Sequence, residues 1–87
     1  MATTFDEKYR QISQRTTDAL RKAFGPNVTI QTDEGWHGRI HVKIVASALN
    51  GLSEDEKQIR IWETLRQELS EEAQEVSLVL AYGMDEI

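Results

Sequence analysis

The stretch from residue 40 to residue 69 constrains the fold most, because it reads as a strand, a turn and a capped helix without a break. Apolar residues occupy alternate positions in segment 40–46, which is the two-residue period of a half-buried strand. Gly51 then interrupts the chain, and Ser53 and Glu56 follow at the spacing of a capping box. In that motif the two side chains satisfy free N–H groups of a helix start. A helix is therefore predicted to begin here.

Apolar residues recur along this predicted helix at spacings of three and four, which is typical of a helix with one buried stripe. The stripe consists of Ile59, Trp62, Leu65 and Leu69. We expect this stripe to face the preceding strand and Trp62 to lie in the core.

A second helical pattern precedes this unit. Apolar residues recur at helical spacing from Thr4 to Phe24, which predicts a helix of roughly 20 residues. Gly25 and Pro26 follow directly. Glycine readily adopts the left-handed conformation found at helix ends, and proline cannot continue a helix, so the helix is predicted to end there.

The remaining segments indicate two more strands and a turn. Val28 and Ile30 alternate with polar residues in a short strand, and segment 33–38 is a polar loop with two glycines. A short helical turn is predicted at 70–73. A last strand follows, and its strong apolarity predicts a central or doubly covered position in the sheet. In this strand Val76, Leu78 and Leu80 alternate with Ser77 and Val79, and a doubly covered strand would bury the leucines.

This order of elements predicts an α+β fold. Helix, strand, strand, helix and strand combine into a two-layer α-β-β-α-β sandwich, with two helices on one face of a three-stranded mixed sheet. At 87 residues the chain is expected to form a single domain, residues 1–87.

The amino-acid composition limits the functions that this chain could have. The chain has no cysteine, which excludes disulfides, thiolate metal ligands and thiol nucleophiles of its own. Its net charge of −5 makes nucleic-acid binding an unfavourable expectation, because phosphate contacts need clustered Lys and Arg. No apolar run is long enough to span a membrane, so a cytoplasmic location is expected. No catalytic motif is present, and we do not expect an enzyme.

Around the glycine turn the chain resembles the BolA-like proteins. Their signature is an aromatic residue, any residue and a glycine, followed after five residues by a basic pair that opens an amphipathic helix. Leu49 stands at the aromatic position, Gly51 at the glycine, and Lys57 and Gln58 at the pair, without a gap. Trp62 takes the place of the family's usual Tyr. The pair is similar to the branch that carries Lys-Gln instead of Arg-His. The resemblance implies a KH-like fold of the second type.

The resemblance also implies a function. BolA-like proteins bind monothiol glutaredoxins and take part in iron-sulfur homeostasis and stress responses. A small protein-binding adaptor is therefore the leading interpretation, present as a monomer or weak homodimer. Gly51, Lys57 and Gln58 are the expected partner-binding residues. Trp36, which lies between glycines in the loop, either anchors an interface or folds back over the sheet edge.

In the family, a two-iron, two-sulfur cluster is shared with the glutaredoxin, and this chain is expected to hold no cofactor alone. The family's ligand positions correspond to Gln58 and to Arg39, which is flanked by His37 and His41. An amide cannot replace an imidazole as an iron ligand. His37 and His41 are the candidate metal ligands, and the alternative is that both are ordinary exposed polar residues.

Two other functions compete with the glutaredoxin adaptor. One is a KH-like transcriptional regulator that binds DNA or RNA, against which the acidic charge argues. The other is a stand-alone interaction domain without cluster chemistry, which the Gln58 substitution favours.

Overall fold

The computed structural model describes residues 4–25, 27–34 and 39–87. Its helices and strands follow the predicted order α-β-β-α-β, which confirms the α+β fold. They are α1 (Thr4–Phe24), β1 (Thr29–Glu34), β2 (Ile40–Ala46), α2 (Glu54–Leu69) and β3 (Val76–Gly83). Short 3₁₀ turns follow β2, α2 and β3, namely η2 (Ser47–Leu49), η3 (Ser70–Glu75) and η4 (Met84–Glu86).

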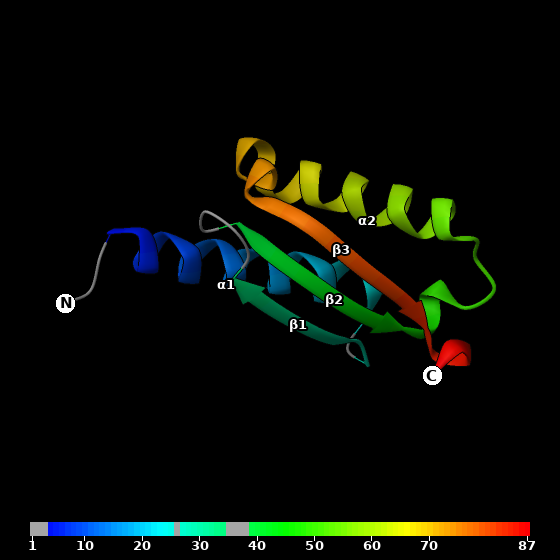
Figure 1. Ribbon diagram of the computed structural model, residues 1–87. Coiled ribbons are helices and arrows are strands. Elements are labelled where there is room, and N and C mark those ends of the chain that lie inside the picture. Colours follow the sequence, from blue (N-terminus) through cyan, green and yellow to red (C-terminus); the bar gives the residue numbers. More distant parts are fainter. Residues whose placement is uncertain (1–3, 26, 35–38) are drawn as a thin grey trace.

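The three strands form one mixed sheet in the order β1-β2-β3, as Figure 1 shows. β1 pairs with β2 antiparallel, and β2 pairs with β3 parallel. The mixed sheet was predicted, but the central position of the last strand is wrong. β2 lies in the centre and β3 at an edge, because β3 follows α2 in a crossover that returns the chain beside β2.

Both helices cover the same face of the sheet, which we call the inner face. α1 contacts β1 and β2, α2 contacts β3, and the two helices contact each other (Figure 1). The core lies between these two layers. Its fully buried large side chains include Ile12, Leu20, Ile40, Ile44, Leu49, Ile61 and Leu65.

The helix α1 ends as predicted. Gly25 has φ +97°, and its N–H donates to the Arg21 carbonyl at 3.0 Å. None of the helices in the described part of the chain is long and apolar enough to cross a membrane.

The buried stripe of α2 differs from the predicted one by a rotation of the helix. Lys57, Ile61, Leu65 and Leu69 are buried, at a spacing of four. Ile59 is 58% exposed, so its predicted burial is wrong. The first position of the true stripe is a lysine, whose methylene chain can be buried while its charge finds a partner. A pattern of apolar residues alone therefore misses it.

The inward face of β3 is also shifted. Val76, Val79 and Ala81 are buried, whereas Leu78 and Leu80 are 42% and 44% exposed, so the predicted burial of the two leucines is wrong. The pairing with β2 is irregular at the start, where successive residues of β2 pair with Val76 and Leu78. The intervening residue acts as a bulge and reverses the alternation beyond it.

The polar loop before β2 is shorter than predicted. Asp33 and Glu34 belong to β1, where they pair with His41 and Ile40. The rest of the predicted loop, including Trp36 and His37, lies outside the described residues.

Candidate functional site

The turn before α2 is held by the far end of the chain. Gly51 has φ +75°, a conformation that L-residues with side chains rarely adopt. Its N–H donates to Asp85 Oδ2 at 3.1 Å, and the Asp85 N–H donates to Asn50 Oδ1 at 3.2 Å. The predicted glycine turn is thereby fixed against η4.

The predicted capping box is present at the start of α2. The Glu56 N–H donates to Ser53 Oγ at 3.2 Å, and the Ser53 N–H donates to Glu56 Oε1 at 2.9 Å. The hydrogen bond from the Ser53 backbone N–H is the main cause that lowers the pKa of the Glu56 carboxyl, and a hydrogen bond with the Ser53 side chain is the second cause. Because the cap fixes where α2 begins, it also fixes the direction in which the next residues of the helix point.

Lys57 has an internal role in the structure. Its side chain is 3% exposed, and Nζ forms an ion pair with Glu86 and lies 3.9 Å from Glu54 Oε1. The hydrogen bond to Glu86 is the main cause that raises the pKa of Lys57. The same bond, assisted by the Gly83 N–H at 2.7 Å, lowers the pKa of Glu86. The pair connects α2 to η4, the turn that follows β3. A contact of Lys57 with a partner stays a prediction.

Gln58 bridges α2 and the edge strand. Its Nε2 donates to the Val79 carbonyl at 2.9 Å and to Glu54 Oε2 at 3.3 Å. Its Oε1 accepts a hydrogen bond from Trp62 Nε1 at 3.0 Å. Indole nitrogen can only donate, so this contact also sets which end of the amide faces Trp62. Both donor hydrogens and the oxygen of Gln58 are therefore engaged within the protein.

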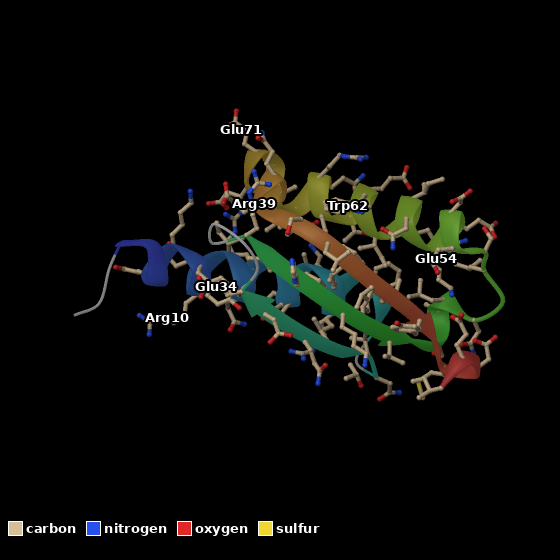
Figure 2. All side chains as sticks on the ribbon, viewed as in Figure 1. Arg10, Glu34, Arg39, Glu54, Trp62 and Glu71 are labelled. Atoms are coloured by element: carbon tan, nitrogen blue, oxygen red, sulfur yellow. The ribbon has the colours of Figure 1, made fainter. Side chains whose placement is uncertain are left out.

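Trp62 lies on the side of α2 next to this bridge. It is partly buried and packs against the core, which agrees only in part with the prediction of a core residue. Figure 2 shows it on α2, further along the helix than Glu54. Its hydrogen bond orients the Gln58 amide toward β3. Trp62 thus holds the Gln58 amide in the orientation in which it donates to the Val79 carbonyl.

His41 lies on the central strand of the sheet. It is half-buried in β2, directly opposite Asp33 of β1 and beside Leu78 of β3. Arg39, at the family's loop-ligand position, donates to the Gln74 carbonyl at 3.0 Å and lies beside η3 (Figure 2). The described residues contain no group of three or more His, Asp or Glu that could hold a metal ion.

The residues at the family's two ligand positions are poorly suited to the cluster that the resemblance implies. Gln58 would have to break its bonds to Val79 and Trp62 to turn toward a metal, and amide oxygen is a poor ligand for iron. Arginine is a cation and cannot ligate a metal cation. Gln58 and Arg39 therefore do not fit as ligands of an iron-sulfur cluster. The ligand role of His37 lies outside the described part of the chain, and that of His41 stays a prediction.

A structure comparison identifies the architecture. BolA1 from Arabidopsis thaliana superposes on this chain with a TM-score of 0.68, covering 87% of this chain and 95% of that protein. The fold is BolA-like. Identity between the two sequences is 17%, and such a likeness shows the fold alone. A scan against protein-family models and a search of curated proteins give no match. Assignment to the branch with Lys-Gln stays a prediction.

The motif that resembles the family's signature spans the turn and the start of α2, with Leu49 and Lys57 buried, Gln58 partly buried and Gly51 exposed. Gly51 and Gln58 lie in the turn and the first part of α2, as the sequence predicted. The sequence did not predict three contacts of this region, namely those with Val79, Asp85 and Glu86. In each contact the two residues are at least 21 positions apart along the chain. No short-range sequence signal could have indicated them.

Proposed function

We propose that this protein is a BolA-like adaptor that binds a monothiol glutaredoxin. The observation that carries the proposal is the coincidence of two independent features. The fold superposes on BolA1 over most of both chains, and the motif that resembles the family's signature occupies a glycine turn and a capped helix. A rigid turn and helix start suit docking, because little conformational freedom is lost on binding.

Docking is proposed to depend on protein contacts rather than on a shared cluster. Gln58 is the residue at the family's His position, and its polar atoms already have partners in Val79, Glu54 and Trp62. We therefore expect the complex to form without iron and sulfide, and their addition to change the affinity by less than about twofold, which is below 0.5 kcal/mol.

The experiment mixes the purified protein with a monothiol glutaredoxin, with and without iron and sulfide. Calorimetry measures the affinity, and visible absorbance detects a cluster. Gln58→Ala tests the predicted contact surface, and Gln67→Ala is the matched control, because Gln67 is exposed further along the same helix. We expect Gln58→Ala to weaken the complex at least fivefold and Gln67→Ala to leave it unchanged.

Three results would contradict the proposal in whole or in part. Absence of a complex under both conditions would remove the glutaredoxin as partner. Binding of duplex DNA with submicromolar affinity at physiological salt would favour the rival regulator, since an acidic domain should lose weak phosphate contacts at that salt. A complex that forms only with iron and sulfide would show that residues other than Gln58 supply a ligand.

A further inference from the structure

The strand β3 has an open edge and an exposed apolar side. It is the last strand of the sheet, and no other strand in the described part of the chain pairs with its outer edge. Its sequence from Val76 to Gly83 contains no charged residue, although the whole chain carries a net charge of −5. Leu78 and Leu80 are 42% and 44% exposed on the face opposite the helices. Uncharged edge strands with exposed apolar side chains are prone to pair with another strand.

Side chains cap backbone groups on this edge. The Gln58 amide donates to the Val79 carbonyl at 2.9 Å, and Glu86 Oε1 accepts from the Gly83 N–H at 2.7 Å. Backbone groups alternate between the two sides of a strand, so the groups of Val79, Ala81 and Gly83 point away from β2. The backbone groups of the two leucines then point toward β2. Gln58 thus occupies the acceptor that an added strand would use.

The other edge of the sheet is different in character. β1 carries Asp33 and Glu34. Charged residues on an edge strand oppose pairing, and like charges from two copies would repel each other. The uncharged β3 edge is therefore the favourable one for a second copy of this acidic chain.

We propose that β3 pairs antiparallel with β3 of a second copy of this chain, in a register centred on Val79. This register places Leu78 of each copy opposite Leu80 of the other. Because the backbone of both leucines faces β2, they meet at a non-hydrogen-bonded position, where opposing side chains lie closest. The two Val79 residues exchange backbone hydrogen bonds, and each Gln58 amide moves off its Val79 carbonyl.

The resulting dimer is weak. One pair of edge strands buries less area than a standard protein interface, and the Gln58 bond is lost for each backbone bond that Val79 gains. The dissociation constant is on the order of 0.1–1 mM. Charge repulsion between two acidic chains opposes the dimer, so added salt strengthens it.

Sedimentation equilibrium of the full chain, from micromolar to millimolar concentration, tests the proposal. Gln58→Leu removes the competing donor and should tighten the dimer at least fivefold. Leu78→Lys places a charge at the leucine pair and should abolish dimerisation. Gln31→Lys adds the same charge at an exposed position of β1 and is the matched control, with no effect on the monomer-dimer equilibrium. Circular dichroism confirms that each variant is folded.

Amide hydrogen exchange provides the second measurement. At high concentration the Val79 and Ala81 amides should become protected in the wild type, and more strongly in Gln58→Leu. The proposal is wrong if Gln58→Leu remains monomeric at millimolar concentration. It is also wrong if Leu78→Lys and Gln31→Lys weaken a dimer equally, or if protection appears on β1 instead of β3.

Discussion

The rotation of α2 decides which side chains meet β3, and two isoleucines on that helix test it. Ile61 is 0% exposed and Ile59 is 58% exposed. Replacing Ile by Ala removes about three methylene equivalents, worth about 2.4 kcal/mol when fully buried. The remaining cavity raises the expected cost of Ile61→Ala to about 3–4 kcal/mol. Ile59→Ala should change the free energy of unfolding by less than about 0.5 kcal/mol, because Ala also has the higher helix propensity.

Urea denaturation followed by circular dichroism measures both variants, with the wild type as reference. For a domain of this size the loss in Ile61→Ala corresponds to a fall in Tm of more than about 12 °C. Equal slopes of the unfolding transitions would show that the denatured states are comparable. A cost above about 1 kcal/mol for Ile59→Ala, with a smaller cost for Ile61→Ala, would refute the rotation. Such a result would also mean that Gln58 and Trp62 do not face the edge of β3.

Three further predictions concern the contacts around the start of α2. Gly83→Ala should destabilise the domain by about 1–3 kcal/mol in urea titration, because its Cβ would lie 2.9 Å from Asn50 Cα; an unchanged midpoint would contradict this packing. Glu86→Gln should destabilise the protein at pH 7, and the difference from wild type should shrink as pH falls from about 4.3 through the lowered pKa of Glu86 in the folded protein, because protonation removes the charge that pairs with Lys57; a pH-independent difference would exclude that ion pair. Ser53→Ala should cost about 1 kcal/mol, and a neutral effect in the same titration would show that the cap is dispensable.

The sequence was a good guide where local interactions decide the structure. The Gly25 helix end, the Gly51 turn and the box of Ser53 and Glu56 all depend on residues within a few positions of each other. The alternation in β2 was also predicted correctly, because that central strand has one face against the helices. These elements were sufficient to predict the order and the mixed sheet.

The errors of prediction have a common physical origin. They concern polar residues that are buried and apolar residues that are exposed. Lys57 is polar by type and buried in fact, because a partner distant in the sequence neutralises its charge. Leu78 and Leu80 are apolar by type and exposed, because a bulge at the start of β3 reverses which residues face the helices. A periodic pattern records residue type only. Neither an ion pair across 29 residues nor a local shift in register can be read from it.

Gln58 departs from the family's pattern, and the structure gives this departure a different interpretation from the one that the sequence suggests. By sequence alone, glutamine at the family's His position indicates a lost ligand. In the structure its amide makes three hydrogen bonds, to Glu54, Val79 and Trp62. An imidazole has only two ring nitrogens, so a histidine could not make all three. Trp62 supplies the donor that orients the amide. The two departures from the family pattern are therefore physically coupled, and together they attach α2 to the edge strand β3.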